Sequence, residues 1–134
     1  MRKLLPLIAA SLVVGAAAAP AAPRDPEREL ARAIEGRVAG EPVDCIQLNR
    51  VRGSRIIPDT AIIYEVGNTL YVNRPRAGAE GMDRWDTLVT RTFGSQLCSI
   101  DTVQLVDMQS GFMNGIVFLG EFVPYRRVQT SSVD

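Results

Sequence analysis

The sequence predicts a mainly β domain, namely a small antiparallel barrel or sandwich of about six strands with a short N-terminal helix. From residue 43 onward, short runs of β-branched, aromatic and other apolar residues are separated by turn signals at short intervals, as is typical of all-β domains. Near the N-terminus, one run between a proline and a glycine has helical spacing instead. The turn signals are Gly53-Ser54, Pro58-Asp59, Gly67-Asn68, 78–81, Gly94-Ser95 and Asn114-Gly115.

The first 21 residues have the layout of a bacterial secretory signal peptide. A positive start at Arg2 and Lys3 precedes an apolar stretch over 4–14 and a run of small residues. The apolar stretch is too short to span a bilayer, and no later segment approaches the ~20 residues that a membrane helix needs. Cleavage is expected after Ala21, or alternatively after Ala18. The sequence therefore predicts a periplasmic protein that does not span the membrane.

Segment 22–42 is predicted to be a linker with one short helix at 26–35. Asp25 is a suitable N-cap, Pro26 suits the first helical position, and Gly36 suits the C-terminal end. The alternative is a frayed, solvent-exposed segment, because ten residues are marginal for an isolated helix. The apolar stripe with which the helix would dock on the domain is Leu30, Ala31, Ile34 and Val38.

The β domain is expected to cover 43–128, and 129–134 are expected to form a flexible tail. Runs rich in strand-forming residues are bounded in each case by turn residues. The predicted strands are 43–51, 61–66, 70–74, 87–93, 102–108 and 115–123.

The hairpin around Gly67-Asn68 is the best-determined local prediction. A two-residue turn with glycine first fits a type II′ connection, which fixes the register of the flanking strands. Tyr64 then faces Tyr71, either as a stacking platform for a ligand or simply as a cross-strand aromatic pair. Both faces carry apolar side chains, so the hairpin is expected to be central in its sheet. The face opposite the tyrosines is predicted to carry Ala61, Ile63, Leu70 and Val72.

Composition excludes several classes of function. Without Arg2 and Lys3, the 15 basic residues fall to 13, all arginine, against 15 acidic residues, which gives no electrostatic case for nucleic-acid binding. The chain has no histidine. This excludes histidine-based metal sites and the usual serine–histidine or cysteine–histidine catalysis.

Two cysteines, Cys45 and Cys98, form an even number in a chain predicted to be exported. A disulfide is the default expectation in an oxidising compartment, and it would be a large share of the stability of so small a domain. The alternative is a redox-active pair. It is disfavoured because there is no Cys-x-x-Cys spacing and no histidine that would lower the pKa of a thiol.

The stretch from Cys45 to Pro124 resembles an uncharacterised family of small exported proteobacterial proteins. Four short segments carry the resemblance: Cys45-Ile46-Gln47-Leu48 with Arg50 and Arg52, Asp59-Thr60-Ala61-Ile62-Ile63, Leu97-Cys98-Ser99-Ile100-Asp101 and Leu119-Gly120-Glu121-Phe122-Val123-Pro124. Members of that family often carry two further cysteines, in regions that here read 78–81 and 112–115 and hold none. Because both are missing here together, the resemblance implies that they form a disulfide with each other in the family. That leaves Cys45 to pair with Cys98 in this chain. The resemblance implies no activity.

Candidate catalytic chemistry is sparse, and no catalytic residue, metal ligand or cofactor site is predicted. Asp83 and Asp86 flank Trp85, which could indicate sugar contacts or a glycosidase pair, but loop carboxylates so placed more often face solvent. Asp101 could be an acid, yet a short polar residue before a strand more often bonds to its own backbone. With Asp107 included, these aspartates still lack the spacing of a calcium loop.

The predicted binding residues are Arg50, Arg52, Tyr71 and Trp85, because arginines and aromatics dominate binding hot spots. Arg50 and Arg52 are expected on one side of the first strand, where they could hold a carboxylate or phosphate. The alternative is that they are solvated, or that they pair with acids such as Asp44 and Glu65.

Three functions remain open from the sequence. The leading one is a non-enzymatic periplasmic binding or interaction domain whose partner is an unknown envelope protein or an anionic envelope ligand. The second is a carboxylate-based hydrolase of envelope glycans, which needs two of Asp83, Asp86, Asp101 and Glu121 to converge in a cleft. The third is a structural accessory protein of envelope stability.

Overall fold

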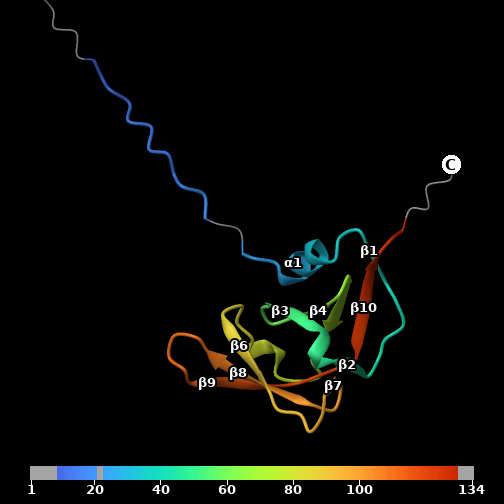
Figure 1. The fold of residues 1–134 in the computed structure, drawn as a ribbon. Coiled ribbons are helices and arrows are strands. Elements are labelled where there is room, and N and C mark those ends of the chain that lie inside the picture. The colour runs from blue at the N-terminus through green and yellow to red at the C-terminus, as the bar shows by residue number, and fades with distance from the viewer. Residues whose placement is uncertain (1–8, 21–22, 130–134) are drawn as a thin grey trace, which may run out of the picture.

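The computed structural model describes residues 9–20 and 23–129. The positive start of the predicted signal peptide, the preferred cleavage position after Ala21 and, apart from Gln129, the predicted tail lie outside these residues. Residues 9–20 form no helix or strand, and they lead away from the folded part of the chain (Figure 1). Leu12, Val13 and Val14 are fully exposed there.

The described chain contains one α-helix, two short 3-10 helices and ten strands. In chain order they are α1 (Pro26–Ala33), β1 (Arg37–Ala39), β2 (Cys45–Gln47), η1 (Leu48–Arg50), β3 (Val51–Ile57), β4 (Ala61–Val66), β5 (Thr69–Asn73), η2 (Ala79–Gly81), β6 (Asp86–Thr90), β7 (Gln96–Cys98), β8 (Thr102–Asp107), β9 (Met113–Phe118) and β10 (Phe122–Arg127).

The strands form three antiparallel sheets. The first has the order β1-β10-β5-β4-β3, the second pairs β2 with β7, and the third has the order β6-β8-β9. The sheets enclose one core without closing into a barrel, as in a sandwich, which confirms the mainly β prediction (Figure 1).

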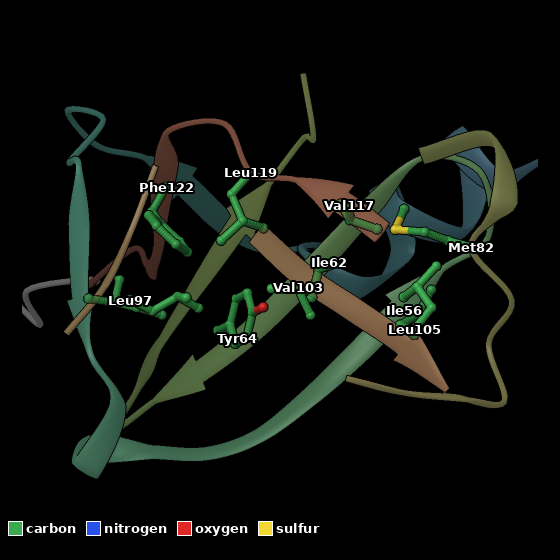
Figure 2. Packing of buried hydrophobic residues seen from close by; sticks show 11 residues of the cluster. Ile56, Ile62, Tyr64, Met82, Leu97, Val103, Leu105, Val117, Leu119 and Phe122 are labelled. Atoms are coloured by element: carbon green, nitrogen blue, oxygen red, sulfur yellow. The ribbon is translucent and has the colours of Figure 1, made fainter. Parts of the chain in front are cut away.

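The main core lies between the sheets. All three sheets contribute apolar side chains to it, among them Ile62 of β4, Leu97 of β7 and Leu105 of β8 (Figure 2). Tyr64 stands edge-on to Phe122 with ring centroids 5.9 Å apart. Its hydroxyl has no hydrogen-bond partner among the described residues, and burial raises its pKa.

The opposite face of the five-stranded sheet is covered by α1. Leu30 of the helix packs against Ile57, Ala61, Ile63 and Val72. The helix begins as predicted, because the Asp25 side chain accepts hydrogen bonds from the N–H groups of Glu27 and Arg28.

Two arginine–glutamate pairs attach α1 to the rest of the domain. Arg74 donates two hydrogen bonds of 2.8 and 2.9 Å to Glu27, and Arg84 donates two of 3.1 Å to Glu29. The helix is therefore a docked part of the domain. The helix prediction therefore holds, and the alternative of a frayed, solvent-exposed segment does not.

The central hairpin has the predicted register. Tyr64 faces Tyr71, Ile63 faces Val72, and both β4 and β5 lie inside the five-stranded sheet. Gly67 has a φ of +58°, as the first residue of a type II′ turn requires. The Tyr64–Tyr71 pair faces the main core, so the prediction of a cross-strand aromatic pair holds and an exposed platform does not form.

The predicted number of strands was too low. The run 43–51 divides into β2, a 3-10 turn and the start of β3, while β1 lies in the segment predicted to be linker and helix. The strands β1, β2 and β7 are three residues long, too short to show periodicity. They form through pairing with distant segments of the chain: β1 pairs with β10, and β2 pairs with β7.

Two predicted turns are interior to strands. Gly53-Ser54 lies within β3, where a β-bulge between Val51 and Gly53 accommodates the glycine. Asn114-Gly115 lies within β9, and the turn before it begins at Asp107, whose carboxylate accepts from the N–H groups of Gln109 and Ser110. These local bonds lower the pKa of Asp107.

The predicted strand 115–123 is divided, because the chain crosses from one sheet to another at Gly120. The amide side chain of Asn73 donates to the carbonyl of Gly120 at 2.7 Å and accepts from its N–H at 2.9 Å. A Cβ atom on Gly120 would collide with the backbone carbonyl of Arg74. β9 therefore ends at Phe118 and β10 begins at Phe122.

Candidate functional site

The predicted disulfide between Cys45 and Cys98 is present. The two residues face each other in the antiparallel pair β2–β7. The bond closes a separation of 53 residues, which the chain-entropy model values at about 4 kcal/mol. It secures these two short strands beside the main core, into which Ile46 and Leu97 project.

Arginines gather where β4 turns into β5. A surface hollow of about 650 Å³ lies at this end of the five-stranded sheet, and we call it the hairpin-end hollow. Its lining has four arginines against one glutamate, so positive charge is in excess. The lining residues are Arg37, Arg52, Glu65, Gly67, Asn68, Thr69, Arg126, Arg127 and Gln129.

Sheet pairing brings Arg37 and Arg127 together. They are direct partners in the β1–β10 ladder, so their side chains leave the sheet on the same face. Arg37 donates from Nη1 to the carbonyls of Asn68, at 2.8 Å, and Tyr125, at 3.1 Å. The turn of the hairpin thus fixes this guanidinium, while its other nitrogens make no hydrogen bond within the described residues.

Arg52 reaches the same turn from the bulged start of β3. Its Nη2 donates to Oε1 of Glu65 at 3.0 Å and to the carbonyl of Gly67 at 2.8 Å. The Arg52 and Glu65 side chains are 63% and 49% exposed, so water weakens the ion pair.

Arg126 and Arg127 are exposed, and their side chains make no hydrogen bond or ion pair with any residue that the structure describes. A guanidinium presents five N–H donors in a planar fork that matches a carboxylate or a phosphate. The hairpin-end hollow therefore combines two positioned arginines with Arg127, whose donors are free for an anion on the same face of the sheet as Arg37. Arg126, the preceding residue of β10, leaves the sheet on the opposite face, and its guanidinium lies near Gly40.

The four predicted binding residues do not come together. Arg52 lines the hairpin-end hollow, but Arg50 belongs to the 3-10 turn before β3, so the two arginines do not share one side of a strand as predicted. Tyr71 packs against the main core. Trp85 is 71% exposed and lies beside a different hollow.

The sequence interpretation missed Arg37, Arg126 and Arg127. It selected Arg50 and Arg52, which are close together in the sequence, whereas the hollow is assembled by antiparallel pairing of β1 with β10. The adjacent arginines that end the last strand were a signal in the sequence. Their convergence with Arg37 depended on a strand too short to predict.

The carboxylates beside Trp85 hold their own loop together. Asp86 is buried, and its Oδ2 accepts from the Asp83 N–H at 2.9 Å and from the Asn114 amide at 3.3 Å. Asp83 accepts from the N–H of Trp85 at 3.0 Å. Backbone and amide donors therefore occupy the carboxylate oxygens that a glycosidase pair would need.

The other two carboxylates proposed for catalysis are elsewhere. Asp101 accepts from the N–H of Cys98 at 2.7 Å, as expected for a local backbone contact. Glu121 lines a second hollow of about 450 Å³, next to the disulfide, which we call the disulfide-side hollow. Arg74, Arg76, Tyr125, Asp44 and Ser99 are among its other lining residues.

Within 9–20 and 23–129, no group of histidine, cysteine, aspartate or glutamate side chains is arranged to hold a metal ion. In the same ranges no helix is long and apolar enough to cross a membrane. In comparisons with known proteins, the chain matches no protein-family model, no curated protein and no solved structure. The resemblance to exported proteobacterial proteins stays a prediction.

Proposed function

We propose that this protein is an exported, periplasmic, non-enzymatic binding domain, and that its hairpin-end hollow receives an anionic group of an envelope ligand. The observation that carries the proposal is the excess of arginine in one hollow, four against a single glutamate. Export is supported by the layout of the first 21 residues and is compatible with the disulfide.

The rigid surroundings of the hollow favour binding. Arg37 and Arg52 are fixed by the turn carbonyls of Asn68 and Gly67, so the positive charge is in place before a ligand arrives. Preorganisation lowers the entropy cost of association. A phosphate or carboxylate would complete the contacts of Arg127 and of the remaining nitrogens of Arg37, and envelope lipids and acidic glycans supply such groups.

The test measures the melting temperature in sodium phosphate and in sodium glucuronate, each against sodium chloride at the same ionic strength. A ligand at ten times its dissociation constant stabilises the folded state by about 1.4 kcal/mol. We expect at least one of the two anions to raise the melting temperature of the wild-type protein.

Two variants with equal charge loss locate the site. Arg126→Gln with Arg127→Gln should lose most of the anion effect, because each charge-assisted hydrogen bond contributes about 1.5–3 kcal/mol. Arg28→Gln with Arg91→Gln, whose side chains lie outside the hollow, should retain it. An equal response of both double variants, or no response of the wild type to either anion, would refute the proposal.

A further inference from the structure

An edge strand from each of two sheets lies beside one hollow. β3 ends the order of the five-stranded sheet, and β6 ends that of the three-stranded sheet. Between them lies a hollow of about 430 Å³, which we call the edge groove; the two strands lie near each other in Figure 1. Its lining residues are Glu29, Ser54, Arg55, Ile56, Arg84, Trp85, Asp86, Thr87 and Leu88.

The backbone of both edges is available for pairing. In an antiparallel pair, alternate residues direct their N–H and C=O groups away from the partner strand. β3 pairs only with β4 and β6 only with β8, and no backbone hydrogen bond joins β3 to β6 in the described chain. Unpaired edges of this kind are templates for an added strand.

The floor of the edge groove is apolar. Ile56 is buried in the main core, and Leu88 is partly buried and packs against that core. Side chains of an extended peptide alternate between two faces, so every second residue of an added strand would face these two side chains. Apolar residues at those positions would be favoured.

The side chains that line the edge groove include two arginines and two acids, and one of the arginines, Arg55, has no partner within the described residues. Arg84 is paired with Glu29 in a bidentate contact, and Asp86 accepts from Asp83 and Asn114. Arg55 is exposed, and its guanidinium makes no hydrogen bond or ion pair within the ranges that the structure describes.

We infer that the edge groove binds an extended segment of a partner protein, which adds as a strand with apolar residues toward Ile56 and Leu88 and an acidic residue toward Arg55. Backbone pairing with both edges supplies affinity, and the alternating pockets supply specificity. This inference is independent of the hairpin-end hollow, because Arg55 and β6 do not contribute to that hollow.

The experiment titrates the full mature chain with the peptide acetyl-Thr-Glu-Val-Glu-Val-Glu-Thr-amide and follows the backbone amides by two-dimensional NMR. We expect saturable shifts at Ser54, Ile56, Thr87 and Leu88. The same peptide N-methylated at every internal nitrogen keeps its side chains but loses its strand donors toward both edges, and we expect it not to bind.

Charge reversal tests the role of Arg55. A peptide with lysine in place of glutamate should bind about tenfold more weakly, and Arg55→Glu should reverse this preference, since like charges across an interface are costly. Arg32→Glu, on the exposed surface of α1, is the matched control and should leave the preference unchanged.

Four outcomes would overturn the inference. They are the absence of shifts at the groove amides, equal binding of the N-methylated peptide, and a preference that Arg55→Glu does not move. The fourth is a set of shifts at the same amides that depends on protein concentration without peptide, because a second copy of the chain would then occupy the edge.

Discussion

The hairpin-end hollow and the disulfide-side hollow both contain arginines, but they use them differently. In the disulfide-side hollow, Arg74 is bound twice by Glu27, and Arg76 donates to the carbonyls of Leu119, at 2.7 Å, and Ser99, at 3.3 Å. Asp44 and Glu121 line the same hollow, so charge is balanced there. In the hairpin-end hollow, four arginines face one glutamate.

The difference shows that an arginine is available to a ligand only to the extent that its guanidinium is not already hydrogen-bonded within the fold. Arg74 and Arg76 hold α1 and the crossing between sheets in place. Arg126 and Arg127 have no such partner among the described residues. Removing arginines from the disulfide-side hollow should therefore reduce stability, and removing them from the hairpin-end hollow should reduce binding.

The largest expected effect concerns the disulfide next to the disulfide-side hollow. Replacing Cys45 and Cys98 with serine should lower the free energy of unfolding by about 4 kcal/mol, because the unfolded chain regains the entropy that the crosslink removes. Denaturant unfolding of this variant and of Ser99→Ala, which keeps the bond, measures the difference. Equal stabilities, or two alkylated thiols in the native protein, would contradict this prediction.

The next effect compares one arginine from each hollow directly. Arg76→Ala removes charge-assisted hydrogen bonds to two carbonyls, so we expect a loss of about 1.5–3 kcal/mol. Arg126→Ala removes the same charge and should stay within about 0.5 kcal/mol of the wild type. Urea unfolding of both variants checks this, and losses of similar size would remove the distinction between the hollows.

The smallest effect depends on pH. The hydrogen bonds from Arg74 lower the pKa of Glu27 in the folded state. The ion pair therefore stabilises the fold above the ordinary glutamate pKa of about 4.3, and this contribution is lost as pH falls through the lowered value. Because both side chains are exposed, the contribution should be below about 1 kcal/mol.

The measurement compares the wild type with Glu27→Gln at pH 7 and pH 3. The variant should be less stable at pH 7, and the gap should shrink at pH 3. Glu35→Gln is the control, since the Glu35 side chain makes no hydrogen bond or ion pair within the described chain. A gap that persists at pH 3 would mean that the pair does not cause it.

The sequence predicted the elements whose determinants are local. A two-residue turn set the register of β4 and β5, and Asp25 with Pro26 marked the start of α1. It did not predict β1 or β7, because three residues carry no periodicity and their partners are distant in the chain. The turn signal at Gly53-Ser54 failed because pairing with β4 prevailed over local propensity.

The same limit applied to the candidate site. Of the two arginines predicted for it, Arg52 lines the hairpin-end hollow and Arg50 does not. The aromatic partners did not join it, because Tyr71 packs against the main core and Trp85 lies near β6. Which arginines meet depends on the strand order β1-β10-β5-β4-β3, and pairing between distant segments sets that order.

The most direct test of the proposed anion site is an NMR titration of the mature protein with sodium phosphate at constant ionic strength, read at both hollows. We expect saturable shifts at Gly67, Asn68 and Thr69 and none at Ser99 or Gly120, because, of these two hollows, the hairpin-end hollow is the one with an excess of arginine. Saturation at Ser99 and Gly120 instead, or shifts at neither hollow, would contradict the assignment of function to the hairpin-end arginines.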